Sequence, residues 1–164
     1  MPRFHHSRTV LVALMLLLGW HVSAQADASM TLQVTSSSSG ADTVELSLAD
    51  LDAMEQVTYR TTTLWTDGMV TFSGVPLAKI LAKAGVQGTA IQMKALNDYQ
   101  VEMPLSVLEE SIPLVATRMN GEQMSVRDKG PYWVVFPYDQ SAKYQTETIY
   151  SYSIWQLDRL RVIN

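Results

Sequence analysis

The 164-residue chain contains no cysteine, and this absence constrains its fold more than any other feature. No disulfide can crosslink the chain, so its stability has to come from a packed hydrophobic core. A chain of this length is long enough to form such a core as one domain. Apolar residues make up 47% of it, which is sufficient material for that core.

The N-terminal segment has the pattern of a secretory signal peptide. Arg3 and Arg8 give a positive start, residues 10–20 are apolar, and Val22-Ser23-Ala24 supplies small residues for cleavage, with Ala24-Gln25-Ala26 as a nearby alternative. The apolar stretch is shorter than the roughly 20 residues that a transmembrane helix needs, although an uncleaved anchor is the alternative interpretation. We expect residues 1–24 to be a signal peptide and the protein to work in the periplasm, with no direct membrane insertion after cleavage.

The charge of the remaining chain argues against two classes of partner. Without Arg3 and Arg8 it holds 10 Lys and Arg against 16 Asp and Glu, a net charge of −6. Nucleic acids and anionic membrane surfaces attract basic proteins, so neither is an expected partner.

The pattern of apolar residues predicts many short strands and a few short helices. Strands are expected at residues 30–35, 43–48, 57–63, 90–95, 99–103, 114–119, 123–126 and 132–136, with one or two more within 149–163. The strongest hairpin signal is Asn120-Gly121, and Asn97-Asp98 is a second turn signal.

Helices are expected at residues 48–54 behind the cap Ser47, at 77–84 between Pro76 and Gly85, and at 104–110, with a loop at 64–73. This mixture predicts an α+β fold in a single domain. Residues 25–42 would form an N-terminal lead and first strand, and residues 43–164 the main body.

Cysteine and histidine, on which most enzymes rely, are both missing from this main body. The three histidines of the chain, His5, His6 and His21, all lie in the expected signal peptide. The commonest general base and the commonest metal ligand are therefore both absent. Carboxylate pairs such as Glu109-Glu110 fit a solvated surface better than a catalytic dyad, because no spacing favours the latter.

Aromatic and basic side chains in loops provide a different kind of candidate site. Trp65 lies between Thr61-Thr62-Thr63 and Thr66-Asp67-Gly68, where it either folds back onto the core or offers a stacking surface to a flat heterocycle. The run Arg127-Asp128-Lys129-Gly130-Pro131 is either a solvated turn or a binding loop for anions and carbonyl oxygens. Arg118, on an expected strand, points either to solvent or into a cleft.

A series of motifs resembles the sulfite oxidase-type molybdopterin-binding fold over residues 43–162. They are Phe72-Ser73-Gly74-Val75-Pro76-Leu77, Ala84-Gly85-Val86, Ala95-Leu96-Asn97-Asp98-Tyr99, and Lys129-Gly130-Pro131 before an apolar strand that ends at Pro137. Each motif is weak alone, and their order and spacing together carry the resemblance.

This chain departs from that fold at two functional segments. The resemblance implies a molybdenum-ligating cysteine in the loop at residues 61–68, which here holds only threonines, Leu64, Trp65, Asp67 and Gly68, and a hydroxyl is a poor ligand for a soft metal. It also implies a basic segment for the cofactor phosphate, where this chain has Tyr152-Ser153-Ile154-Trp155. Both departures favour an unphosphorylated aromatic ligand without molybdenum.

The full set of motifs, including Ser153-Ile154-Trp155-Gln156-Leu157, looks like the small periplasmic pterin-binding regulators of cyclic-di-GMP enzymes. This resemblance implies a non-catalytic protein that binds a reduced, unphosphorylated pterin. It also implies docking onto the periplasmic region of an inner-membrane protein of the GGDEF/EAL type. Two alternatives stay open: a molybdopterin-dependent oxidoreductase-like protein, and an interaction module without a ligand.

Under the pterin-binding hypothesis, Trp65 stacks on the ring, opposite Tyr138 or Trp155. Asp67 or Asn97 accepts hydrogen bonds from the ring, and Arg118, Arg127 or Lys129 contacts its oxygens. The complete expected set of ligand-binding residues is Thr63, Trp65, Asp67, Asn97, Tyr99, Arg118, Arg127, Lys129, Tyr138 and Trp155.

Overall fold

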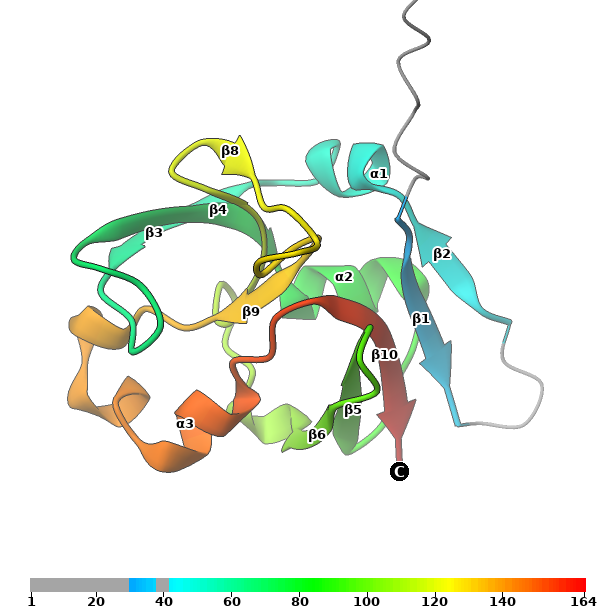
Figure 1. Cartoon of the computed structure of the whole chain (residues 1–164). Helices are drawn as coiled ribbons and strands as arrows, with labels where there is room; N and C mark the ends of the chain where they lie inside the picture. The colour runs from blue at the N-terminus through cyan, green and yellow to red at the C-terminus, as the bar shows by residue number, and fades with distance from the viewer. Residues whose placement is uncertain (1–29, 38–41) are drawn as a thin grey trace, which may run out of the picture.

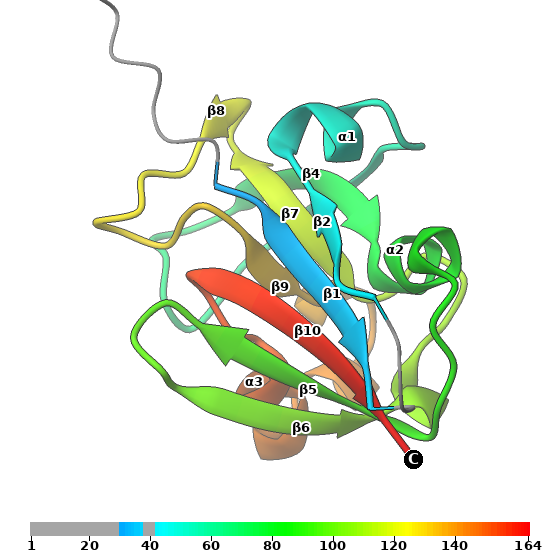
Figure 2. The same ribbon diagram turned by 90° about the vertical axis from the view of Figure 1, so that its right-hand side faces the viewer.

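The computed structural model describes residues 30–37 and 42–164, so the expected signal peptide lies outside the described residues. This part of the chain folds into two five-stranded sheets with short helices around them (Figures 1 and 2). The expectation of a single α+β domain is confirmed.

The first sheet joins the two ends of the described chain. Its strand order is β2-β1-β10-β5-β6, in which β1 and β10 are parallel and the other neighbours antiparallel. In β10, Leu157, Leu160 and Val162 are fully buried, and a register shift between Leu157 and Arg159 interrupts the alternation. The strands are β1 (Leu32–Ser36), β2 (Val44–Leu46), β5 (Ala90–Ala95), β6 (Gln100–Pro104) and β10 (Leu157–Ile163).

The second sheet is antiparallel and contains the most deeply buried strands. It runs β3-β4-β7-β8, and β9 also pairs with β7. Every residue of β9 is fully buried, in agreement with the continuous apolar run expected there. The strands are β3 (Val57–Thr61), β4 (Val70–Pro76), β7 (Leu114–Met119), β8 (Glu122–Gln123) and β9 (Trp133–Val135).

The helices are short, and two have the termini that the sequence indicated. Ser47 caps α1 (Leu48–Asp52) in a capping box with Asp50. Gly85 ends α2 (Leu77–Ala84) in the left-handed conformation at φ 68°. Helix α3 (Glu147–Tyr152) and the 3-10 turns η1 (Leu105–Val107), η2 (Tyr138–Gln140) and η3 (Ala142–Tyr144) complete the fold.

Four expected elements differ from the structure. The strand expected at residues 123–126 is only the two-residue β8, because the Asp128 and Gly130 amides donate to the Ser125 carbonyl and form a turn there. The loop expected at residues 64–73 ends early, because β4 begins at Val70 and buries Val70 and Phe72 against the core. The strand expected from residue 149 is instead helix α3, which Thr146 caps by accepting a hydrogen bond from the Ile149 amide. The helix expected at 104–110 is only the single turn η1.

A glycine fixes how closely β4 and β7 approach each other. A Cβ atom on Gly74 would lie 2.1 Å from the carbonyl oxygen of Val115, whereas one on Gly68, at φ +65°, would meet no atom within 4 Å. We expect Gly74→Ala to lower the free energy of unfolding by about 3 kcal/mol, through forced separation of two core strands.

The matched variant Gly68→Ala should cost about 1 kcal/mol, since only the left-handed backbone is penalised there. Urea unfolding followed by circular dichroism measures both variants. Equal losses would show that the strand contact at Gly74 tolerates a methyl group.

Candidate ligand-binding pocket

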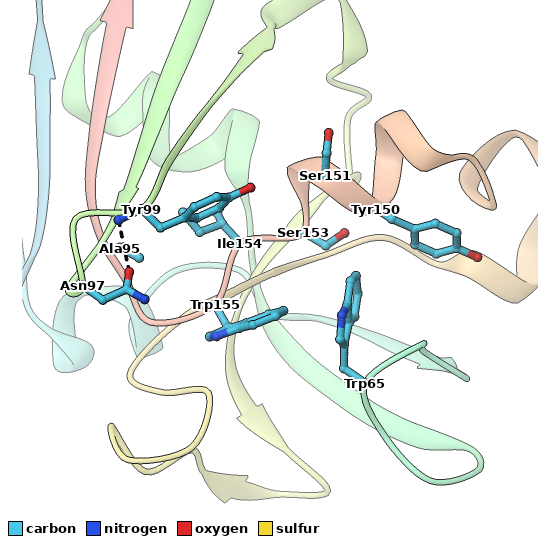
Figure 3. A pocket seen from close by; sticks show the side chains of 9 residues that line it. All are labelled: Trp65, Ala95, Asn97, Tyr99, Tyr150, Ser151, Ser153, Ile154 and Trp155. Atoms are coloured by element: carbon cyan, nitrogen blue, oxygen red, sulfur yellow. Dashed lines mark hydrogen bonds between the residues drawn. The ribbon is translucent and has the colours of Figure 1, made fainter.

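An open pocket lies where three segments meet: the β3–β4 loop, the β5–β6 turn and the connection from α3 to β10 (Figure 3). Its volume is about 320 Å³. The residues that line it are Trp65, Ala95, Asn97, Tyr99, Tyr150, Ser151, Ser153, Ile154 and Trp155.

Hydrogen bonds shape the loop that carries Trp65. The Thr63 hydroxyl accepts a bond from the Trp65 amide at 3.0 Å and pairs with the Thr66 hydroxyl at 2.8 Å. At the base of the loop, the Thr62 amide and hydroxyl donate to the Asp139 carboxylate at 2.6 and 2.8 Å. These two donors hold the pKa of Asp139 below its ordinary value. Thr63 thus builds the loop and does not line the pocket.

Trp65 both packs on the core and lines the pocket. Its ring makes edge contacts with Trp133, Tyr138, Tyr150 and Trp155, at centroid distances of 5.9, 6.4, 6.0 and 5.6 Å. Edge-to-face contacts are the favoured geometry of aromatic pairs, so this cluster fixes the position of the loop. The two alternative interpretations of Trp65 are therefore compatible.

Of the two tryptophans that line the pocket, Trp155 is more accessible than the half-buried Trp65. Its side chain is 36% exposed, and Figure 3 shows it between Asn97 and Tyr99 on one side and Trp65 on the other. The planes of Trp65 and Trp155 are inclined by 66°. Two rings in edge contact at this angle leave no parallel gap, so they cannot hold a ligand ring between their faces. The pocket offers one stacking face and an aromatic wall.

The polar groups of the pocket are largely engaged by the protein itself. Asn97 Oδ1 accepts a hydrogen bond from the Tyr99 amide at 3.1 Å, which leaves the Asn97 NH₂ group to face a ligand. Ser153 Oγ accepts from the Tyr138 hydroxyl and donates to the Ile149 carbonyl. None of the nine described residues that line the pocket carries a charge. The lining therefore suits a neutral ring.

A second, more polar depression, with a volume of about 550 Å³, shares Trp65 with the first pocket. Lys129 Nζ there is 3.2 Å from Asp128 Oδ1 and also lies 5.7 and 5.9 Å from the ring centroids of Trp133 and Trp155. The lining residues are Leu64, Trp65, Thr66, Asp67, Val70, Met119, Asn120, Asp128 and Lys129.

Four of the expected binding residues therefore line the first pocket, and two others line only the second. Trp65, Asn97, Tyr99 and Trp155 line the first; Asp67 and Lys129 line the second.

Three other expected residues lie elsewhere, besides Thr63. Arg118 makes a two-pronged ion pair with Asp52, with nitrogen–oxygen distances of 2.6 and 2.8 Å, and lines neither pocket. Arg127 is exposed and also lines neither. Tyr138 is buried, and its hydroxyl donates to Ser153 Oγ at 2.6 Å, so its ring supports Trp65 from behind and cannot oppose it across a ligand.

Helix α3 and its connection to β10 supply pocket residues that the sequence interpretation did not select. Tyr150, Ser151, Ser153 and Ile154 all line the pocket. They were overlooked because this segment was interpreted as strand, whereas a helix brings Tyr150 to Trp65. The high density of aromatic residues between 150 and 155 is the sequence signal that indicates a pocket wall in this segment.

Within residues 30–37 and 42–164, no group of three or more His, Cys, Asp or Glu side chains is arranged to hold a metal ion. The helices in this part of the chain are also too short or too polar to cross a membrane.

Comparison with known proteins identifies the family. A model of the oxidoreductase molybdopterin-binding domain matches residues 20–144. The chain belongs to this family. The sulfane dehydrogenase SoxCD from Paracoccus pantotrophus has a similar structure, with a TM-score of 0.59 over 81% of this chain and 38% of that chain. At 14% identity, this likeness shows the fold alone. No curated protein matches the chain at a significant level.

The residues present do not fit the molybdenum cofactor that the family name implies. The chain has no cysteine to provide a thiolate, and the first pocket has no cation in its lining to bind a phosphate. Lys129 in the neighbouring depression is already paired with Asp128. No redox step is therefore assigned to these side chains.

Because Tyr138 is buried, the free energy of unfolding is expected to fall at alkaline pH. Desolvation raises the pKa of Tyr138 from its ordinary value of 10 to about 12. The folded state thus holds the phenolic proton more tightly than the unfolded state. Its contribution to stability is complete below pH 10 and is lost as the pH rises from 10 to 12.

We expect Tyr138→Phe to reduce the loss of unfolding free energy between pH 9 and pH 11.5, measured by urea unfolding at each pH. Tyr132, whose pKa is also raised to about 12 by burial, remains in this variant and contributes to the residual slope. Burial raises the pKa values of Tyr59 and Tyr144 too, so these residues contribute to it in the same direction. An unchanged pH dependence would contradict the assignment to Tyr138.

Proposed function

We propose that this domain is a non-catalytic binding protein for a small, flat, unphosphorylated heterocycle of the reduced pterin class. One observation carries the proposal: an uncharged pocket formed by Trp155, Trp65, Tyr99 and Tyr150 within a molybdopterin-binding fold. Pockets for small ligands span roughly 300–1,000 Å³, and this pocket of about 320 Å³ is near the lower end. One bicyclic ring suits it better than a larger phosphorylated cofactor.

In the proposed complex, the ring lies on the exposed face of Trp155 with its edge toward Trp65. The Asn97 NH₂ group donates to the ring carbonyl, which is the reverse of the accepting role expected from the sequence, because Oδ1 is held by the Tyr99 amide. Asp67, exposed in the neighbouring depression, accepts from an amino or hydroxyl group that extends past Trp65.

We further propose that the protein acts in the periplasm and regulates an inner-membrane cyclic-di-GMP synthase or phosphodiesterase through the periplasmic region of that enzyme. The export signal expected at residues 1–24 and the motif resemblance support this proposal. Deleting the gene should change cyclic-di-GMP levels only in cells that contain the partner enzyme. The same change in cells without the partner would contradict the proposal.

The ligand is tested directly with protein purified from its native host. Mass spectrometry and fluorescence of the released small molecules should identify a pterin, and calorimetry should detect binding of tetrahydrobiopterin. Absence of both a native pterin and binding of the added one would remove the pterin hypothesis.

Trp155→Ala should weaken binding of tetrahydrobiopterin by roughly ten- to a hundredfold, because aromatic stacking contributes about 1–3 kcal/mol. Calorimetric titration measures the dissociation constant, and circular dichroism checks the fold. Arg118→Ala is the control, since the Arg118 guanidinium is bound to Asp52 outside both pockets. An effect of Arg118→Ala as large as that of Trp155→Ala would place the ligand elsewhere.

Family membership supports a second candidate, an oxidoreductase-like protein that keeps the molybdenum cofactor. Elemental analysis of the natively purified protein separates the two candidates. We expect less than a tenth of an equivalent of molybdenum, because soft-metal sites depend on thiolate ligands. A near-stoichiometric amount would favour the oxidoreductase.

A further inference from the structure

Gln156, directly after the pocket residue Trp155, has an unusual backbone. Its φ angle is +53°, in the left-handed region that residues other than glycine rarely adopt. Such a conformation persists only where surrounding contacts enforce it, and it is frequent at functional sites. The contacts of Gln156 therefore indicate which parts of the structure hold it in this conformation.

The backbone of Gln156 joins two loops to the pocket. Its carbonyl oxygen accepts a hydrogen bond at 2.9 Å from the amide of Leu96, in the turn that carries Asn97 and Tyr99. Its own amide donates at 3.1 Å to the carbonyl of Lys129, the residue whose ammonium lies on the rings of Trp133 and Trp155.

The side chain of Gln156 makes a further connection to the same loop. Its Nε2 atom donates to the Val126 carbonyl at 2.7 Å and reaches the Asp128 carbonyl at 3.5 Å. A carboxylate of the same length would instead place negative charge against two carbonyl oxygens. The amide is thus the group that this position requires.

We propose that Gln156 is a positioning residue of the ligand pocket. It holds the β5–β6 turn and the loop at residues 126–129 against Trp155, and so fixes both the polar end of the pocket and the cation on the Trp155 ring. The effect on ligand affinity rests on the proposed function. The clamp itself is a property of the ligand-free protein and is tested separately.

Three variants test the clamp. Gln156→Glu keeps the length but removes the donor, and Gln156→Gly relaxes the positive φ while removing the side chain. Gln56→Glu is the matched control, because Gln56 Nε2 also bridges two carbonyl oxygens, those of Leu51 and Met54, away from both pockets.

Hydrogen–deuterium exchange of the ligand-free protein is the first measurement. In both Gln156 variants we expect faster exchange in peptides that cover residues 126–130, because both lose the side-chain donor to the Val126 and Asp128 carbonyls. In Gln156→Gly we also expect faster exchange at residues 95–99, because the freed backbone holds the Leu96 amide less firmly, with exchange in β7 and β9 unchanged in both variants. The control should leave those two loops as in the wild type. Unchanged loops in Gln156→Glu and Gln156→Gly, or equal loosening in the control, would overturn the clamp.

Calorimetry with tetrahydrobiopterin is the second measurement. We expect an affinity loss of about five- to tenfold in each Gln156 variant, as for one lost hydrogen bond, and none in the control. Loosened loops with wild-type affinity would overturn the positioning role. If the wild-type protein itself does not bind, the proposed function fails, and the exchange data still decide whether the clamp exists.

Discussion

The edge contacts of Trp133 connect the hydrophobic core to the pocket. Trp133 is fully buried in β9, and its ring meets those of Phe72, Trp65 and Trp155 at 5.2, 5.9 and 6.2 Å. Its Nε1 also donates to the Ser153 carbonyl at 3.2 Å, in the connection that leads to β10. One core side chain thus orients the two tryptophans that bound the pocket. A pocket wall built on a close-packed core has little freedom to rearrange.

The arrangement of charges separates this site from one that holds a phosphorylated cofactor. Two of the three cations that the sequence pointed to are paired within the protein: Arg118 with Asp52, and Lys129 with Asp128. The third, Arg127, is exposed and lines neither pocket. The first pocket keeps a neutral lining in a chain with an excess of acidic residues. The absence of charged side chains from the described lining of the first pocket supports the proposal of an unphosphorylated ring.

Local signals in the sequence were sufficient where one residue decides the conformation. The Ser47 cap, the Gly85 terminus of α2 and the Asn120-Gly121 hairpin were all predictable, because each depends on its own backbone and side-chain chemistry. Helix α3 was not predictable from the sequence. Its six residues are too few to show a helical period of apolar residues, and one threonine at Thr146 is a weak signal for a cap.

The same limit applies to the pocket. Loop aromatics were identifiable from the sequence, and Trp65, Tyr99 and Trp155 do line the cavity. That Arg118 lies outside both pockets was not identifiable, because its pairing with Asp52 spans 66 residues and depends on tertiary packing.

The position of β10 has a consequence for the order of folding. This strand lies between β1 and β5, so the last segment of the described chain fills the middle of the first sheet. A chain that emerges from its N-terminal end cannot close that sheet until residues 157–163 arrive, and pairings between such distant segments form slowly. Trp155 and Gln156 immediately precede this strand. Assembly of the pocket and completion of the sheet therefore become possible at the same moment, and a partly emerged chain has neither.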